Sequence, residues 1–441
     1  MVLVDLVINQ KSSMLIDSYE FWCYKASIKK NKITSKIEYQ VVYDEKVMTE
    51  LKKFNLYEKV MKDTIKELIV DKQDFITLDE LLSFVSELGG KTFGFSKHLI
   101  IPVLFRILNM ERIGSLLVDN QIDEIYLDSS KSYLYIDHAQ YGRCSSQIRL
   151  SKKEIDSFIH RVALENDFNL NRENPTMKGD FVTKLFHTRI TVDIPPLLID
   201  DIHLDIRKFR HHNFHLKDLI DIGSITKSQG IFLSIIMSNL VSLSIIGPPN
   251  SGKTTLQNAL LEFIPSHFRV LSVEDVLETS SLRRGNQVRF RLGYDPHESN
   301  IYTKAMEIQK LLHRSPDYVN LGELSTKDNF IAFLNVLSVG IPSIQTIHGK
   351  DPNYLLLRLQ DIYKIPINLI KTSFPHVFVE MDTVWRENIR KRFIIRIAEL
   401  TPEGDILTIS DRQNDRFSDS QINTHSSFTI NYLETRNLDM I

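Results

Sequence analysis

Cysteine is almost absent from this chain, because Cys23 and Cys144 are the only two and lie far apart. They provide neither a disulfide framework nor a C-x-x-C pair for zinc, so we expect a reducing compartment. Glycine and proline are also scarce, at 16 and 14 of 441 residues, against a usual combined share of about 12%. This scarcity excludes a collagen-like, linker-like or largely disordered chain.

An excess of positive charge is missing as well. Lys and Arg together number 54 and Asp and Glu 56, so the formal net charge is −2. A protein that coats duplex nucleic acid is usually strongly basic, so nucleic acid is not an expected partner. Hydrophobic residues make up 42% of the chain, which is enough for more than one globular core.

No apolar run is long enough to cross a bilayer. The longest, IFLSIIMSNLVSLSIIG at 231–247, contains Asn239 and four serines and is shorter than the roughly 20 residues that a span requires. The first ten residues carry Asp5 and lack the basic and apolar regions of a signal peptide. We therefore expect a cytoplasmic protein that reaches a membrane only by docking peripherally onto a partner there.

In the first half of the chain the sequence pattern changes from mostly helical to alternating strands near residue 116. Residues 47–115 are mostly helical in pattern, with helices expected at 58–70 and at 78–90, the second ending on a glycine pair. Alternating strands and a helix with a capping box, Ser151 with Glu154, follow. The expected elements are strands at 123–128, 132–137, 188–194 and 202–207 and a helix at 151–166. A His-rich linker is predicted at 210–218.

From about residue 216, strands and helices alternate, which predicts a mostly parallel sheet covered on both faces. The expected strands are 241–246, 269–273, 317–321 and 342–346, and the expected helices 253–263, 303–314 and 329–338. Three further strands after His376 have the pattern of an antiparallel meander. The predicted parts are a partly helical region (1–115), an α+β domain (116–209), the linker (210–218) and an α/β domain (219–441).

A phosphate-binding loop is complete between Gly247 and Thr254. The run Gly247-Pro248-Pro249-Asn250-Ser251-Gly252-Lys253-Thr254 fits G-x-x-x-x-G-K-[ST], follows an expected buried strand and opens an expected helix. Its glycines let backbone N–H groups surround phosphate oxygens, and the helix directs its positive end at the anion. Lys253 would reach the β- and γ-phosphates and the Thr254 hydroxyl would bind Mg²⁺. The sequence therefore predicts a nucleotide site.

Acidic residues and a histidine follow later expected strands at their carboxyl ends, where ligands gather in α/β sheets. Glu274, Asp275 and Glu278 follow the strand at 269–273, Glu323 follows the strand at 317–321, and His348 follows the strand at 342–346. A phosphate loop needs such a carboxylate to hold the Mg²⁺ shell or to orient the attacking water.

These blocks together resemble the type II/type IV secretion ATPase superfamily, which powers secretion systems, type IV pili and the archaellum. The resembling blocks are GPPNSGKTT (247–255), VEDVLE (273–278), RSPDYVNLGE (314–323) and TIHG (346–349), in the order of the family's Walker A, Asp box, Walker B and His box. DIRKF (205–209) and TRITVDIPP (188–196) are similar to segments that precede the family's linker. The likeness covers about 120–410, and the absence of a four-cysteine zinc insert favours an archaeal or type IV-like branch.

The resemblance implies the fold and the reaction. The fold would be α/β, a RecA-like P-loop NTPase domain behind a smaller α+β N-terminal domain that covers the nucleotide, and the assembly a homohexameric ring. Mg²⁺-dependent ATP hydrolysis would drive secretion or the assembly of pilin-like subunits, with a polytopic membrane protein as platform. The alternatives left open are a DNA-translocating ATPase and an assembly protein that does not hydrolyse ATP.

The resemblance also implies a role for each residue of the site. Glu323 would be the catalytic carboxylate, His348 the γ-phosphate sensor and Glu278 a further catalytic Asp-box residue. Glu274 and Asp275 would hold Mg²⁺ with Thr254, partly through water. The whole of 247–255, which includes Thr255, would bind the nucleotide, and Arg189 and Arg207 would clamp its phosphates from within the same chain.

Three positions depart from the family's pattern. Leu324-Ser325 stands where the Walker B block commonly continues to an arginine, Asn320 interrupts a normally apolar strand, and Pro249-Asn250 replaces a common Thr-Gly. These departures bear on hydrolysis more than on nucleotide binding.

Overall fold

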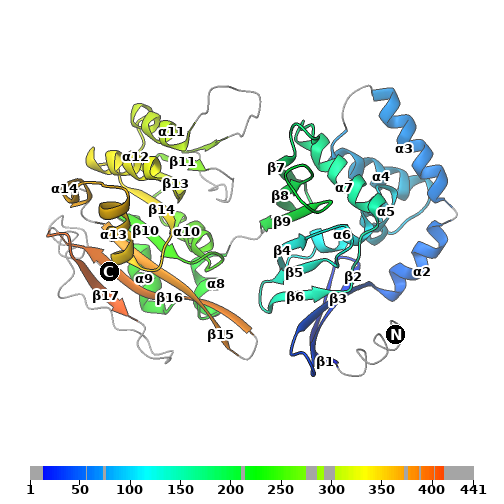
Figure 1. Ribbon diagram of the computed structural model, residues 1–441, viewed down its shortest axis with the longest axis horizontal. Coiled ribbons are helices and arrows are strands. Elements are labelled where there is room, and N and C mark those ends of the chain that lie inside the picture. The colour runs from blue at the N-terminus through cyan, green and yellow to red at the C-terminus, as the bar shows by residue number, and fades with distance from the viewer. Residues whose placement is uncertain are drawn as a thin grey trace. The chain divides into compact units, whose positions relative to one another are not determined.

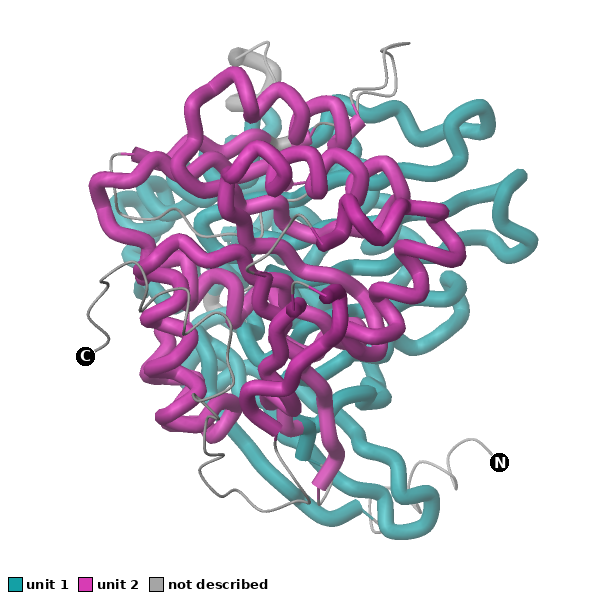
Figure 2. The backbone as a smooth tube through the Cα atoms, turned by 90° about the vertical axis from the view of Figure 1, so that its left-hand side faces the viewer, with its two compact units in different colours: residues 1–211, 388–390 teal, residues 212–387, 391–441 magenta. Residues whose placement is uncertain are grey.

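The computed structural model divides the chain into two compact units, residues 1–211 with 388–390, and residues 212–387 with 391–441 (Figure 2). The residues described are 13–55, 57–72, 76–209, 214–274, 286–292, 303–371, 376–386, 389–401 and 403–411. The division at 211/212 falls inside the expected linker. The domain boundaries drawn from the sequence stay a prediction.

A single sheet organises the first unit, and within the described residues its strand order is β1-β2-β3-β6-β5-β4-β9-β8-β7 (Figure 1). Neighbouring strands are antiparallel except β3 and β6, which run parallel. The strands are β1 (Ser13–Phe21), β2 (Tyr24–Asn31), β3 (Ile37–Tyr43), β4 (Ile122–Leu127), β5 (Tyr135–His138), β6 (Gly142–Ser146), β7 (Thr176–Val182), β8 (His187–Asp193) and β9 (His203–Phe209).

Strands β1, β2 and β3 were not expected from the sequence, and they join the sheet of the later strands. The buried Asp119 fastens them, because its Oδ2 accepts hydrogen bonds from the hydroxyls of Tyr19 on β1 and Tyr39 on β3, each at 2.7 Å. A buried carboxylate needs such donors to offset its loss of water. The change of sequence pattern expected near residue 116 therefore does not separate two sheets, because strands from both sides of it join one sheet.

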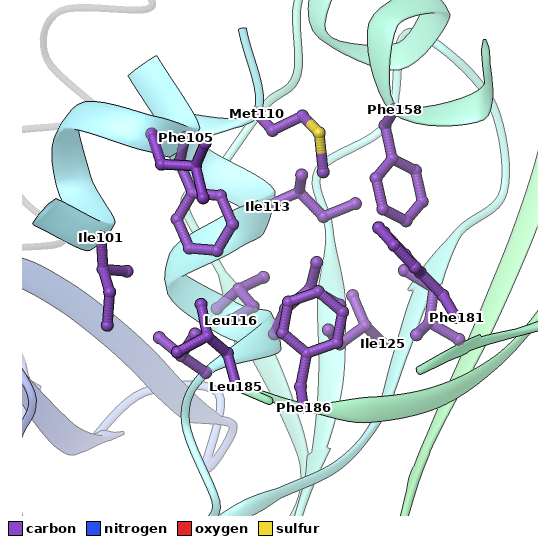
Figure 3. Close-up of a cluster of buried hydrophobic side chains, with 14 of the residues drawn as sticks. Ile101, Phe105, Met110, Ile113, Leu116, Ile125, Phe158, Phe181, Leu185 and Phe186 are labelled. Carbon is purple, nitrogen blue, oxygen red and sulfur yellow. The ribbon is translucent and has the colours of Figure 1, made fainter. Parts of the chain in front are cut away.

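Helices cover the sheet of the first unit and supply much of its apolar core. They are α2 (Glu45–Phe54), α3 (Glu58–Lys72), α4 (Leu78–Thr92), α5 (Ile100–Ile107), α6 (Glu111–Leu117), α7 (Lys152–Glu165) and a 3-10 turn at Lys97–Leu99. Figure 3 shows side chains of α5, α6 and α7 meeting those of the strands, with Phe158, Phe181 and Phe186 on one side and Phe105 on the other. The capping box of Ser151 and Glu154 is confirmed at the start of α7.

The expected end of α4 at its glycine pair is wrong. The helix continues through Gly89 and Gly90 to Thr92, and a Cβ at Gly89 would lie 3.0 Å from the ring of Phe95. Gly89 therefore permits a close approach of Phe95, and this packing outweighs the usual helix-breaking tendency of glycine.

The sheet of the second unit has the order β12-β11-β13-β14-β10-β15-β16-β17 among the described residues. Strands β10 to β15 pair with one another in parallel, as expected for alternating strands and helices. The strands are β10 (Ser242–Gly247), β11 (Val270–Glu274), β12 (Gln287–Arg291), β13 (Tyr318–Leu324), β14 (Ser343–His348), β15 (His376–Arg386), β16 (Ile389–Leu400) and β17 (Ile406–Asp411).

Two strand predictions need correction. The expected antiparallel meander includes β15, but β15 pairs in parallel with β10, because helices carry the chain back across the sheet after β14; β16 and β17 are antiparallel. The strand expected at 317–321 continues as β13 to Leu324, so Glu323 lies inside the strand rather than after it.

Helices flank this sheet in Figure 1 and follow the expected pattern. They are α8 (Leu216–Asp221), α9 (Lys227–Ser238), α10 (Lys253–Leu261), α11 (Lys304–Leu311), α12 (Lys327–Ser338), α13 (Pro352–Leu357) and α14 (Ile367–Lys371), with a 3-10 turn at Leu312–Arg314 and a π-helical turn at Arg358–Ile362. The apolar run at 231–247 is divided between α9 and β10. In the described part of the chain, no helix has the length and apolar character needed to span a membrane.

Candidate nucleotide site

The phosphate loop connects β10, buried at every position, with helix α10. A Cβ on Gly247 would collide with the carbonyl oxygen of Met381, and Gly252 has a φ of +93°, so both positions require glycine. Asn250 has a φ of +59°, in the left-handed region that asparagine tolerates better than most residues. The departure from Thr-Gly at Pro249-Asn250 therefore preserves a loop conformation that glycine would otherwise supply.

Lys253 directs its ammonium group back into this loop. The side chain is buried, and its Nζ donates to the carbonyl oxygens of Gly247 at 3.1 Å and Pro248 at 2.8 Å. The same Nζ lies 3.2 Å from Nδ1 of His348. An ammonium group has no acceptor site, so Nδ1 of His348 accepts and its Nε2 carries the ring proton.

His348 in turn contacts the predicted catalytic carboxylate. Its Nε2 lies 3.2 Å from Oε2 of Glu323, so Lys253 on α10, His348 on β14 and Glu323 on β13 form one hydrogen-bonded chain. The hydrogen bond from His348 is the main reason that the pKa of Glu323 is lowered, with the positive charges of Lys253 and Lys304 adding to it against the opposing effect of burial. Glu323 is therefore an ionised carboxylate at neutral pH, available to orient water or accept a proton.

A bulge in β13 presents Glu323 to this chain. The register of β13 against β14 shifts between Asn320 and Glu323, and Gly322 has a φ of +56°. Lys304, at the start of α11 and 5% exposed, donates from Nζ to the backbone oxygen of Glu323 at 2.6 Å. Sequence reasoning missed Lys304, because nothing in its local pattern distinguishes it from a solvated lysine of an amphipathic helix.

Thr254 and Glu274 are the described residues that would hold Mg²⁺. Thr254 lies in the first turn of α10, and Glu274 ends β11, buried against Gly322, at which a Cβ would lie 3.3 Å from Cγ of Glu274. A hydroxyl and a carboxylate beside a phosphate loop suit Mg²⁺, which prefers oxygen ligands and usually keeps water and phosphate in its shell. Thr255 follows Thr254 on α10, whereas Asp275 and Glu278 lie outside the described residues.

Two arginines that the sequence did not single out support the backbone of the site. Arg392 on β16 donates from Nε to the carbonyl oxygen of Asn250 at 2.8 Å, and so fixes the tip of the phosphate loop. Arg358 donates from Nη1 to the carbonyl oxygen of His348 at 3.0 Å, with its guanidinium over the ring of Phe330. Both contacts depend on tertiary packing, which no local sequence motif indicates.

Arg189 and Arg207 lie in the first unit, on facing positions of β8 and β9. The Nε of Arg189 is 3.2 Å from Oδ1 of Asp180, in an ion pair that holds its side chain. Their expected contact with the nucleotide stays a prediction.

A comparison with known families identifies the family of the chain. The family model described as "Type II/IV secretion system protein" matches residues 106–379, more than half of the chain. The chain belongs to this family.

Relatives with known sequences match over part of their length. An uncharacterized protein of Methanocaldococcus jannaschii is 28% identical over 201 residues, 44% of this chain and 72% of that protein. A second protein of that organism is 23% identical over 299 residues, 66% of this chain and 52% of that protein. Protein VirB11 of Agrobacterium fabrum is 32% identical over 154 residues, 35% of this chain and 42% of that protein. The chain thus spans about half the length of several relatives, and the matches to Methanocaldococcus jannaschii agree with an archaeal-like branch.

A solved structure supports the fold. The X-ray structure of the Legionella pneumophila ATPase DotB matches with a TM-score of 0.51 at 15% identity, covering 68% of this chain and 82% of that one. The expected RecA-like domain with a preceding N-terminal domain is confirmed at the level of fold.

Proposed function

We propose that this protein is a motor ATPase that works as a homohexamer and uses ATP hydrolysis to power secretion or filament assembly by a type II/IV-like machine. The observation that carries the proposal is the hydrogen-bonded chain from Lys253 through His348 to Glu323. It connects the group that would bind the β- and γ-phosphates with the group that would activate water. Loss of the γ-phosphate near Lys253 would therefore change the position of Glu323 through His348.

Each residue of the chain has a defined task in this proposal. Lys253 would leave the loop carbonyls for phosphate oxygens, while the N–H groups at the start of α10 support the anion. The ionised Glu323 would orient the attacking water and accept its proton, and His348 would sense the γ-phosphate between them. Bound Mg²⁺, held by Thr254 with Glu274 and Asp275 partly through water, would neutralise charge on the β- and γ-phosphates.

The remaining residues keep their sequence-based roles as proposals. The segment 247–255 would surround the phosphates, and Glu278 would assist Glu323 from the Asp box. Arg189 and Arg207 would add positive charge to the γ-phosphate from within the same chain, as arginines do in other phosphoryl-transfer enzymes.

The proposed partners are those that membership of the family implies. The ring would dock peripherally on the inner face of the membrane through a polytopic platform protein, and its work would move pilin-like or secreted subunits of a pilus, an archaellum or a secretion system. A DNA-translocating ATPase is the rival, and the near-neutral net charge of −2 speaks against it. An ATPase that DNA stimulates strongly at physiological salt would favour the rival.

The decisive experiment measures ATP turnover in the wild type and in Glu323→Gln. The substitution is nearly isosteric but cannot accept a proton, and a general base contributes about 10²–10⁴-fold to rate. We expect the wild type to hydrolyse ATP. The Glu323→Gln variant should bind ATP without hydrolysing it and should sediment as a hexamer in the presence of ATP. Absence of wild-type turnover would instead indicate a non-hydrolysing assembly protein. Unchanged turnover in Glu323→Gln with loss in Glu278→Gln would move the catalytic role to the Asp box.

A further inference from the structure

Asn320 is a fully buried amide in the middle of β13, at one of the positions where the sequence departs from the family's pattern. Its side chain joins three segments of the second unit. Oδ1 accepts a hydrogen bond from Nε2 of Gln257 at 2.7 Å, and Nδ2 donates to Oγ of Ser272 on β11 at 3.3 Å. The same Oδ1 accepts from the backbone N–H of Gly322 at 3.2 Å.

One end of this network is the helix of the phosphate loop. Gln257 lies four residues after Lys253 on α10 and is itself buried. Residues four apart share a face of a helix, so Gln257 moves with the turn that carries Lys253 and Thr254. Its amide makes a polar contact from α10 to the strand that carries Glu323.

The other end is Gly322, the residue that immediately precedes Glu323. The bulge takes Gly322 out of the regular register with β14, and its N–H is bound by Oδ1 of Asn320. On the far side, Lys304 holds the carbonyl oxygen of Glu323. The backbone that aims the Glu323 carboxylate is therefore held by two side chains rather than by the strand ladder alone.

We propose that Asn320 is a positioning residue that couples the phosphate-loop helix, through Gln257, to the orientation of Glu323. The inference rests on the proposed catalytic role of Glu323. An amide suits this task, because its oxygen accepts two hydrogen bonds while its nitrogen donates a third. A leucine at position 320 would leave the buried side-chain amide of Gln257 without its acceptor. The backbone N–H of Gly322 would also lose its hydrogen bond to the side chain at position 320.

The test compares Asn320→Leu, Gln257→Leu and the double variant for kcat, for the Kd of ATP and for Tm. A displacement of about 1 Å in a catalytic group can cost on the order of 10²-fold in rate. We expect Asn320→Leu to lower kcat about 10-fold or more while the Kd of ATP changes little. Because the double variant no longer carries the unpaired amide of Gln257, its Tm should recover in part, while its kcat stays as low as in Asn320→Leu. The double variant also keeps the test valid if Asn320→Leu folds poorly.

A matched control is Gln345→Leu. Gln345 is a buried amide of β14 in the same sheet, and its side chain is hydrogen-bonded to Ser244 at 2.5 Å and Ser343 at 3.0 Å rather than to Gly322. It should lower Tm and leave kcat near the wild-type value.

Two results would overturn the coupling: recovery of kcat together with Tm in the double variant, or unchanged kcat in Asn320→Leu when Glu323→Gln is inactive. An active Glu323→Gln is a different failure, because it removes the catalytic role on which the inference rests.

Discussion

His348 on β14 places its Nε2 3.2 Å from Oε2 of Glu323 on the neighbouring strand β13, while its Nδ1 accepts from Lys253. The histidine is thus the bridge between the phosphate loop and Glu323, the proposed catalytic carboxylate. Its hydrogen bond is also the main cause of the lowered pKa of Glu323.

Removing this bridge should change the pH dependence of turnover. In the proposed mechanism turnover requires the ionised carboxylate, so kcat should fall as the pH drops through the pKa of Glu323. In His348→Ala the lowering contribution is lost and the pKa rises, so this fall should begin at a higher pH than in the wild type. Profiles of kcat between about pH 3 and 8 include the acid limb and measure the shift. An acid limb at the same pH in both proteins would contradict the role of His348.

Lys253→Ala should weaken ATP binding and reduce hydrolysis to background, because the charge of the β- and γ-phosphates loses its partner. Equilibrium binding of ATP and steady-state turnover test this. Lys350→Ala is a suitable control, since Lys350 lies over the ring of Tyr354 and outside the loop. Turnover at the wild-type rate in Lys253→Ala would mean that the nucleotide binds elsewhere.

Mixing Arg207→Ala with Lys253→Ala before assembly tests whether Arg207 acts within its own chain. Both single variants should be inactive, since an inserted arginine can contribute about 10³–10⁵-fold to rate. If Arg207 serves its own phosphate loop, no subunit of a mixed ring has a complete site, and activity stays absent. Recovered hydrolysis would refute the same-chain arrangement. The mixed rings must also be shown to form and to bind ATP.

His376 should make stability depend on pH. It is buried on β15, with Nε2 2.7 Å from Oγ of Ser244, and burial lowers its pKa to about 3. The unfolded chain binds this proton near pH 6.5 and the folded chain does not, so stability is complete above pH 6.5 and falls as the pH drops from there toward 3, by about 1.4 kcal/mol per unit. Tm should therefore fall less between pH 7.5 and 5 in His376→Gln than in the wild type. An equal fall would contradict this.

Local patterns were sufficient for the parts of the site that a short segment defines. The phosphate loop needs a buried strand, two glycines and a helix in succession, and residues 242–261 supply all of them. Glu323 and His348 were predictable for a related reason, since parallel strands end at the same edge of a sheet. The structure adds that they share one hydrogen-bonded chain with Lys253.

The remaining features depend on contacts between distant residues. Gln257 and Asn320 meet across two elements, and Asn320 alone resembles a defect in an apolar strand. Lys304 and Arg392 reach backbone carbonyls of the site from α11 and β16, and no spacing rule relates them to it. Strands β1 to β3 were missed because their place in the sheet is determined by pairing with β6, about a hundred residues later.

The pairing of β10 has a consequence for how the protein is synthesised. Both of its neighbours, β14 and β15, follow it in the chain, so neither has been synthesised when Lys253 leaves the ribosomal exit tunnel. The described strands of the first sheet all precede residue 210, and that unit can fold while β10 is still unpaired. Every residue of β10 is buried in the finished sheet, so this stage exposes an apolar strand. A nascent chain arrested between β10 and β15 should therefore bind chaperones and lack affinity for nucleotide.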